Sequence, residues 1–168
     1  MPDGVATAAD RRASLARIAA EAILTIATTV ERSLDRHAAE YGITDAKLEV
    51  LEILSCCSGR RACLFTLGDR MGVTRPNVTK LIDGLERQGL VKRQPHPDDR
   101  RMVHAQLTEA GAEIAARALP GRVELLERLW QHLDEDELRD ISEALVVAAR
   151  TGPTNCAMKP SDAEALST

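Results

Sequence analysis

The chain has 168 residues, 44% of them hydrophobic, which is enough to bury the core of one domain or of two closely joined parts. Only Tyr41, Phe65 and Trp130 are aromatic, and the many Ala and Leu residues favour packed helices over a β-sandwich. No leading apolar segment resembles a signal peptide, and no uninterrupted run of about 18 apolar residues suggests a membrane span, so we expect a cytoplasmic protein with no membrane partner.

The net charge of −4 is distributed unevenly along the chain. Residues 60–107 contain ten Lys or Arg and five Asp or Glu, a local charge of +5, which leaves −9 on the rest. A basic module on an acidic body is the pattern expected where only one face of a protein meets phosphate. The charge distribution is therefore compatible with nucleic-acid binding, although the total charge is negative.

Residues 11–43 are predicted to form a long N-terminal helix and the turn that ends it. Apolar residues recur in steps of three and four along it: Leu15, Ile18, Ala22, Ile26, Val30 and Leu34. A helix this long in so small a protein usually needs a partner along its length. We therefore interpret this segment as a dimerisation helix.

Residues 44–107 are predicted to form a separate lobe. Thr44 or Asp45 should cap a helix whose core face carries Leu48, Leu51, Ile53 and Leu54. Residues 63–65 could form a very short strand that pairs with a later hairpin. Thr66 should cap a short helix with Leu67 and Met71 facing inward, and Gly72-Val73 should turn the chain into the next helix.

The helix that follows has one apolar and one polar face. Thr74 is a good N-cap, Pro76 suits the first turn, and Gly89 should end the helix in a left-handed conformation. The buried face is predicted to consist of Val78, Leu81, Ile82 and Leu85. The outward face consists of Pro76, Thr79, Lys80, Asp83 and Arg87, flanked by Arg75 and Asn77.

A hairpin is predicted directly after this helix. Residues 90–94 and 102–107 are two short strand-like runs around a turn-rich tip at 95–101, where two prolines should prevent further ladder pairing and leave the arginines projecting. A helix with polar groups outward followed by a basic-tipped hairpin is typical of a winged helix-turn-helix. Such a helix fits the major groove of DNA, and such a tip fits a phosphate backbone or a minor groove.

Residues 108–150 are predicted to form the C-terminal dimerisation helices. Thr108 should cap a long helix with a kink at Pro120-Gly121, and Asp134 should cap the last helix. The core side of that last helix carries Leu138, Ile141, Leu145 and Val146, and residues 151–168 have the composition of a tail. The sequence thus predicts a mainly α fold with a small β-wing: a winged helix-turn-helix plus a long-helix dimerisation region.

Two motifs resemble the MarR (multiple antibiotic resistance regulator) family. Asp99-Arg100-Arg101 followed after five residues by Leu107-Thr108-Glu109-Ala110-Gly111 is similar to the family's wing signature, and residues 73–75 with 85–91 resemble its recognition helix. The resemblance implies a homodimeric DNA-binding transcription factor, most often a repressor. Such a repressor leaves an inverted-repeat operator when a small anionic or phenolic ligand binds or a cysteine is oxidised.

The resemblance also assigns roles to the wing residues. Arg101 matches the arginine that enters the minor groove, and Asp99 matches the residue that braces it; a narrow minor groove attracts arginine because its negative potential is concentrated. Thr66, at a helix N-terminus, could anchor a phosphate. The alternative is that the charged tip is only a solvated loop. The candidate DNA-binding residues are Thr66, Thr74, Arg75, Pro76, Asn77, Thr79, Lys80, Asp99, Arg100 and Arg101.

The cysteines leave a redox-sensing regulator as an alternative. Family members that sense peroxide usually carry the reactive cysteine near the start of the first long helix, and this chain has none there. Cys56, Cys57 and Cys63 lack the C-x-x-C spacing of a zinc site, and Cys156 falls in the tail. We interpret them as small buried or half-buried apolar residues, and we expect no metal and no cofactor.

Two further alternatives concern the class of protein. The sequence has no G-x-S-x-G elbow, phosphate-binding glycine loop or H-E-x-x-H motif, so we expect no enzyme. A winged helix that binds only proteins is also conceivable, but such an adaptor has no need for projecting arginines at its wing tip.

Overall fold

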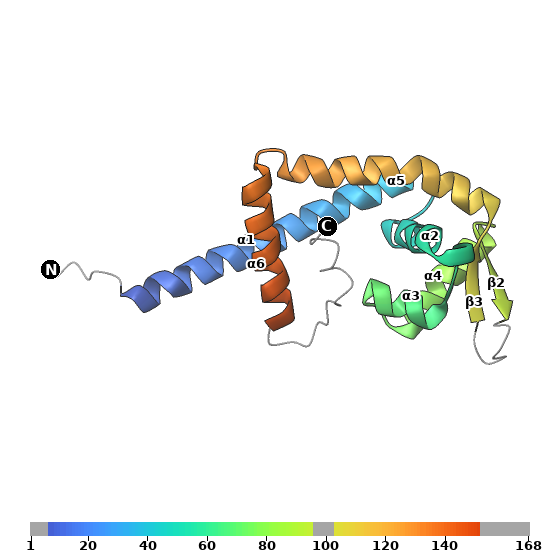
Figure 1. The fold of residues 1–168 in the computed structure, drawn as a ribbon, viewed down its shortest axis with the longest axis horizontal. Coiled ribbons are helices and arrows are strands. Elements are labelled where there is room, and N and C mark those ends of the chain that lie inside the picture. The colour runs from blue at the N-terminus through green and yellow to red at the C-terminus, as the bar shows by residue number, and fades with distance from the viewer. Residues whose placement is uncertain (1–6, 96–102, 152–168) are drawn as a thin grey trace.

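The computed structural model describes residues 7–95 and 103–151. In chain order the elements are α1 (Ala8–Ala39), α2 (Asp45–Cys56), a short 3-10 turn (Ser58–Arg60), β1 (Arg61–Cys63), α3 (Leu64–Met71), α4 (Arg75–Arg87), β2 (Val91–Pro95), β3 (Val103–Leu107), α5 (Glu109–Trp130) and α6 (Glu135–Thr151). Figure 1 shows a compact lobe, α2 to β3, beside one end of the long helices α1 and α5. The predicted fold class is confirmed.

Local capping sets where the long helices begin. Thr7 and Asp10 form a reciprocal capping box, so α1 begins earlier than the sequence analysis expected. Thr44 rather than Asp45 caps α2, and Thr108 caps α5 by accepting the Gly111 N–H at 3.1 Å. Asp134 accepts the Glu137 N–H at 2.9 Å, which confirms the predicted start of α6.

The lobe contains a three-stranded antiparallel sheet in the order β1-β3-β2. The short first strand pairs Ala62 with Ala105, two residues upstream of its predicted place, because the chain already enters α3 at Leu64. Pro95 ends β2 opposite Val103, so the first wing proline lies inside the ladder rather than in the tip. A terminal strand position accepts proline because no further N–H is required there.

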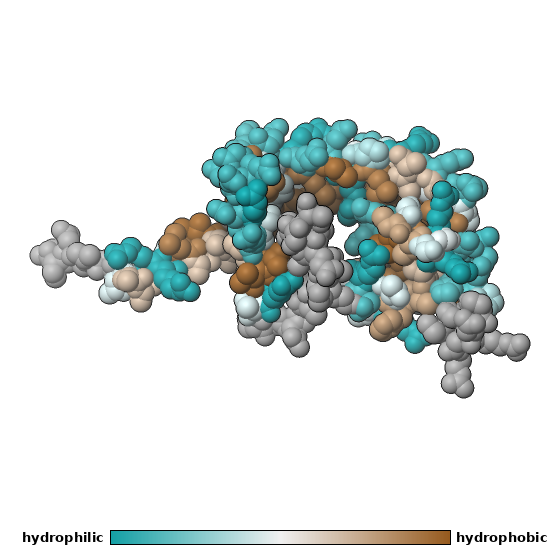
Figure 2. Space-filling view, in the orientation of Figure 1, coloured by the Kyte–Doolittle hydropathy of each residue, from teal (hydrophilic) through white to brown (hydrophobic). Residues whose placement is uncertain are grey.

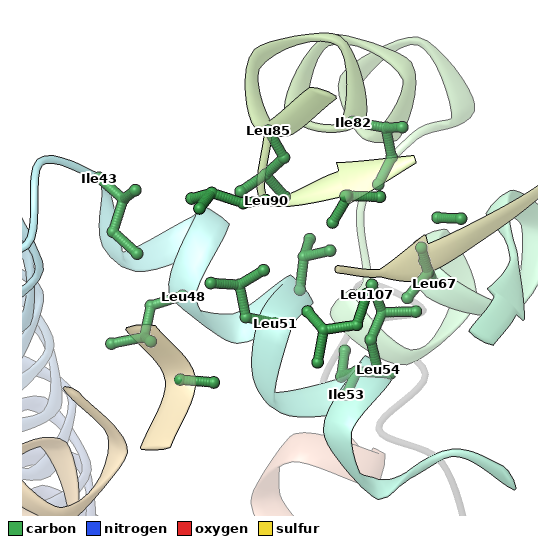
Figure 3. Close-up of a cluster of buried hydrophobic side chains, with 14 of the residues drawn as sticks. Ile43, Leu48, Leu51, Ile53, Leu54, Leu67, Ile82, Leu85, Leu90 and Leu107 are labelled. Atoms are coloured by element: carbon green, nitrogen blue, oxygen red, sulfur yellow. The ribbon is translucent and has the colours of Figure 1, made fainter. Parts of the chain in front are cut away.

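One apolar core holds the lobe together. Leu51 and Leu54 of α2, Ile82 of α4 and Leu107 of β3 point into the same cluster (Figure 3), with Leu67 of α3 beside them. A fully buried side chain of this size contributes about 1.5–3 kcal/mol to folding. Because all the lobe's elements share this cluster, α4 is held by the same core as the strands that carry the wing.

The lobe meets the long helices along a seam of small residues. Ala38 of α1 and Ala115 and Ala118 of α5 belong to the same buried cluster as Leu48 of α2. Pro120 lies inside α5, where a kink was predicted, and the helix continues on both sides of it from Glu109 to Trp130.

The carbonyl groups just before Pro120 accept hydrogen bonds from α1. His37 donates through Nε2 to the Ala118 carbonyl at 2.8 Å, and Tyr41 donates through its hydroxyl to the Arg117 carbonyl at 3.1 Å. A Cβ at Gly121 would come within 2.6 Å of the His37 ring, so glycine makes room for this contact. Residues 120–121 are therefore the docking point of α1 on α5.

Much of the predicted apolar stripe on α1 is uncovered. Leu34 is buried, but Leu15 and Ile18 are 67% and 53% exposed. Figure 2 shows hydrophobic surface on the projecting part of α1, and Leu145 and Val147 of α6 are exposed as well. Among the described residues, α1 is the one helix long and apolar enough to cross a membrane, with an 18-residue window of mean hydropathy 1.4. The predicted absence of an uninterrupted apolar run of this length still holds, because Arg17 and Glu21 interrupt the segment.

A charged contact joins α5 to α2. Arg122 of α5 reaches two carboxylates of α2: its Nε lies 3.0 Å from Asp45 Oδ1 and its Nη1 lies 2.9 Å from Glu52 Oε2. Glu49 lies between these carboxylates in the sequence and is half-buried. Burial raises the pKa of Glu49 above its usual value, and the attraction of Arg122 opposes that shift only in part.

We expect Glu49→Gln to stabilise the protein at neutral pH. Since the pKa of Glu49 is raised in the folded state, the folded chain holds this proton to higher pH than the unfolded chain, and stability falls as pH rises through that window. Thermal unfolding should show the variant more stable by about 2 °C at pH 7.5, with the difference vanishing near pH 4. The matched change Glu52→Gln should lower the midpoint at pH 7.5, because Glu52 pairs with Arg122. An unchanged or lower midpoint for Glu49→Gln would contradict the assignment.

Candidate nucleic-acid interface

The outward face of α4 presents polar and cationic side chains at its N-terminal half. Arg75, Pro76, Asn77 and Lys80 are exposed, and Arg75 and Lys80 pair with no carboxylate in the described part of the chain. Thr79 is half-buried, and its hydroxyl donates to the Arg75 carbonyl at 3.0 Å. The N-terminal half of α4 therefore presents two unpaired cations, Arg75 and Lys80, and the Asn77 side-chain amide to a binding partner.

Thr74 occupies the N-cap position of α4 in an extended conformation, but its hydroxyl makes no capping bond. The prediction that this hydroxyl caps the helix was wrong, although the helix begins where it was expected. Pro76 lies in the first turn, where an absent N–H breaks no helical hydrogen bond. The exposed Thr74 hydroxyl thus remains available to an external acceptor.

Each of the two helices of the helix-turn-helix ends at a glycine. Gly72 ends α3 with φ of +66°, and Gly89 follows α4 with φ of +72°. Beyond Gly89 the Leu90 N–H donates to the Leu85 carbonyl at 3.0 Å and the Gly89 N–H donates to the Glu86 carbonyl at 2.9 Å, a Schellman ending that confirms the predicted stop. The chain enters β2 two residues later, so the wing starts directly from the end of α4.

Thr66 lies inside α3 rather than at its cap. Cys63 takes the N-cap position, which makes Thr66 the third helical residue, and its side chain is exposed. Exposed Phe65 beside it, 76% accessible, is a surface aromatic that the sequence analysis had assigned to a strand. The spacing of Leu64, Leu67 and Met71 at i, i+3 and i+7 is the sequence signal for this helical phase.

Arg93 of β2 fastens the wing to α4. Its Nη1 lies 2.6 Å from Glu86 Oε2, its Nη2 lies 2.6 Å from Asp83 Oδ1, and its backbone N–H donates to Glu86 Oε1 at 3.0 Å. These bonds, the backbone N–H foremost, hold the pKa of Glu86 below its usual value. In the sequence, Arg93 is one of the basic residues of the module and Asp83 is one of the outward groups of α4. The structure shows that these two charges neutralise each other.

The wing residues Asp99, Arg100 and Arg101 lie outside the described residues. The strands that carry them are described: β2 and β3 pair from Val91 opposite Leu107 to Pro95 opposite Val103. The exposed part of this hairpin adds Lys92 to the cations of α4.

The three cysteines within the described residues form no disulfide. Cys56 is exposed, Cys57 and Cys63 are half-buried, and all three are unpaired. The expectation of a buried or half-buried residue was therefore wrong for Cys56, which lies in the last turn of α2. Residues 7–95 and 103–151 contain no group of three or more His, Cys, Asp or Glu side chains that could hold a metal ion.

Comparison with known proteins identifies the relatives of this arrangement. A sequence profile described as MarR family matches residues 43–103. The HTH-type transcriptional regulator YkoM of Bacillus subtilis is 32% identical over 128 residues, which cover 76% of this chain and 79% of that protein. The transcriptional repressor MprA of Escherichia coli is 37% identical over 79 residues, so the match spans only 45% of either chain.

Solved structures agree with the sequence comparisons. The MarR family transcriptional regulator Sco3205 of Streptomyces coelicolor, solved in complex with DNA, superposes with a TM-score of 0.76 at 26% identity over 82% of this chain and 88% of that one. The relatives of this winged helix are thus transcriptional regulators, some of them repressors. The chain belongs to the MarR family of transcriptional regulators.

Proposed function

We propose that the protein is a homodimeric repressor in the cytoplasm that binds an inverted repeat in double-stranded DNA. Helix α4 enters the major groove with Arg75, Pro76, Asn77, Thr79 and Lys80. Thr66 and Thr74 bind phosphates beside it, and Asp99, Arg100 and Arg101 of the wing act at the flanking minor groove. The observation that carries the proposal is the pair of exposed, unpaired cations Arg75 and Lys80 on a helix held rigidly by the lobe core.

A second copy of the chain is the proposed cover for the apolar faces of α1 and α6. Residues 11–43 and 108–150 act in this scheme as the dimerisation region and residues 44–107 as the DNA-binding lobe. The hydroxyls along α1 are already satisfied: Thr25, Thr28, Thr29 and Ser33 each donate to a carbonyl one turn earlier at 2.9 Å. The helix can therefore be buried against another chain without leaving unpaired donors.

A small, largely apolar effector is the proposed release signal. A cavity of about 230 Å³ lies between α1 and α5, and it is lined by Val30, Leu34, Leu126, Leu129 and neighbouring side chains. Such a lining binds a compact hydrophobic molecule. A molecule larger than this cavity that binds better when α1 and α5 are further apart would shift the lobes that both helices carry.

Selection from a random DNA pool tests the proposed function. The wild-type protein should enrich a sequence with two-fold symmetry, and Arg75→Ala with Lys80→Ala should enrich it less or not at all. Arg139→Ala serves as a matched control that removes a cation of α6, outside the DNA-binding lobe. Failure of the wild type to enrich any sequence would refute DNA binding, and enrichment of asymmetric sites would refute the dimeric arrangement.

We expect thiol oxidation to play no part in release. Cys56 and Cys57 lie at the end of α2 and Cys63 directly before α3, none of the three is in a disulfide, and none lies near the start of the first long helix. A variant with all three changed to Ser should bind the selected DNA with wild-type affinity, and peroxide should affect both proteins equally. A peroxide-dependent loss of DNA binding that disappears in the triple variant would establish a redox switch instead.

A further inference from the structure

The face of α5 that meets the lobe carries small apolar residues up to Ala118 and then the long, charged side chain of Arg122. Gly111, Ala115 and Ala118 are buried and recur in steps of three and four, and Arg122 continues the same row one turn later. Glycine and alanine have little or no side chain with which to interlock, so this row resists sliding or rotation of the lobe less than Ile114 and Leu119 beside it, which pack against the same core. The side chain that extends from the row toward the lobe is the arginine.

The face of α2 opposite Arg122 carries three carboxylates. Asp45, Glu49 and Glu52 are spaced at i, i+4 and i+7, which places them on one side of the helix. The Arg122 and Asp45 side chains are only 17% and 21% exposed, so their contact is shielded from solvent. The guanidinium uses two different nitrogens for Asp45 and Glu52, which fixes its direction as well as its distance.

The same contact includes the third helix of the junction. The Asp45 N–H donates to Asp35 Oδ1 of α1 at 3.1 Å, so Asp45 touches α1 through its backbone and α5 through its side chain. Helices α1, α2 and α5 therefore meet at one residue. Within the described residues, the ion pairs of Arg122 with Asp45 and Glu52 join α2 to α5.

We propose that Arg122 is a positioning residue that fixes the angle of the DNA-binding lobe on the long helices, and thereby sets the half-site spacing that the dimer accepts. The inference rests on the proposed function, because spacing has meaning only for a dimer on an inverted repeat. Adding one base pair moves a half-site by about 3.4 Å and rotates it by about 35°. A lobe held in one direction cannot follow that change, whereas a lobe held on α5 only by apolar packing and the exposed Arg60–Glu109 pair, at 4.0 Å, follows it more easily.

The test compares affinities across operators that differ only in spacing. The selected inverted repeat is lengthened and shortened by one and two base pairs, and Kd is measured for the wild type, Arg122→Met and Asp45→Asn. Arg139→Met is the matched control: Arg139 also bridges two carboxylates, Asp136 at 2.7 Å and Glu135 at 3.2 Å, but both lie in its own helix. Thermal unfolding and light scattering verify that each variant is folded and dimeric.

The wild type and Arg139→Met should lose about tenfold in affinity for each single-base-pair change, and Arg122→Met should lose less than about threefold. Asp45→Asn, which breaks the same contact from the other side with little change of shape, should relax the spacing in the same way, and the double variant should behave like either single one. Arg122→Lys should also relax spacing, because one ammonium cannot direct itself at both carboxylates. The inference is overturned if folded Arg122→Met and Asp45→Asn keep the wild-type spacing preference, or lose affinity equally on every operator. If the wild type binds no inverted repeat at all, the proposed function fails instead.

Discussion

Replacing Ile18 and Leu145 with glutamate should convert the protein from a dimer to a monomer. Both side chains are exposed in the single chain, at 53% and 38%, on helices whose apolar faces the chain itself leaves uncovered. Burying each against a second copy contributes about 1.5–3 kcal/mol, and an unpaired carboxylate in the same place opposes association. Light scattering at micromolar concentration measures the change. Arg70→Glu, at an exposed residue of α3, is a control that should remain dimeric.

The loss of the dimer should also weaken DNA binding. One lobe alone reads one half-site, and the gain from joining two lobes is of the order of 100-fold or more. The glutamate variant should therefore bind the full operator about as weakly as a single half-site. A wild-type protein that is a well-folded monomer at micromolar concentration would contradict the dimer, whatever the variant does.

Changes on α4 and on the wing should affect DNA binding in different ways. Arg75→Ala and Asn77→Ala should relax preference at particular base pairs, each contact being worth about 1–3 kcal/mol of discrimination. The reason is that α4 is held by the lobe core and by Arg93, so its side chains meet the same base edges each time. Arg101→Ala should instead weaken binding to all operator variants by a similar factor and reduce the salt dependence by about one unit per half-site.

Affinities for a panel of single-base operator mutants at two salt concentrations separate these effects. Thr151→Ala, at the end of α6, is a control in which neither specificity nor salt dependence should change. If Arg101→Ala leaves binding untouched, the proposed role of the wing is wrong. If Arg75→Ala weakens all operators equally, Arg75 binds phosphate rather than a base.

The elements with strong local signals could be predicted from the sequence. Hydrophobic periodicity and glycine stops located α4 and its ending at Gly89, because both depend on residues within a few positions of each other. The caps at Thr108 and Asp134 were predictable for the same reason. Around Thr66 the prediction failed by a few residues, since a short strand and a short helix compete for the same segment and the pairing of Ala62 with Ala105 decides the boundary.

The contacts that the sequence did not reveal join residues far apart in the chain. Arg93 looked like one more cation of the basic module, yet it neutralises Asp83 and Glu86 across the wing and α4. His37 contacts the turn before Pro120 and so docks α1 on α5, across 81 positions of the sequence. Arg122 follows a row of small residues on α5, and the sequence does not show which helix packs against that row. Such pairings depend on tertiary packing, which no local pattern encodes.

The two-fold symmetric binding of DNA by a dimer is tested most directly with two DNA duplexes that contain the same two half-sites. In one duplex the half-sites form the inverted repeat, and in the other one half-site is reversed to make a direct repeat with unchanged spacing and composition. A two-fold symmetric dimer should bind the inverted repeat about 100-fold more tightly, with two chains per duplex. Equal affinity for the two duplexes, or one chain bound to each, would contradict a symmetric dimer that reads DNA through α4.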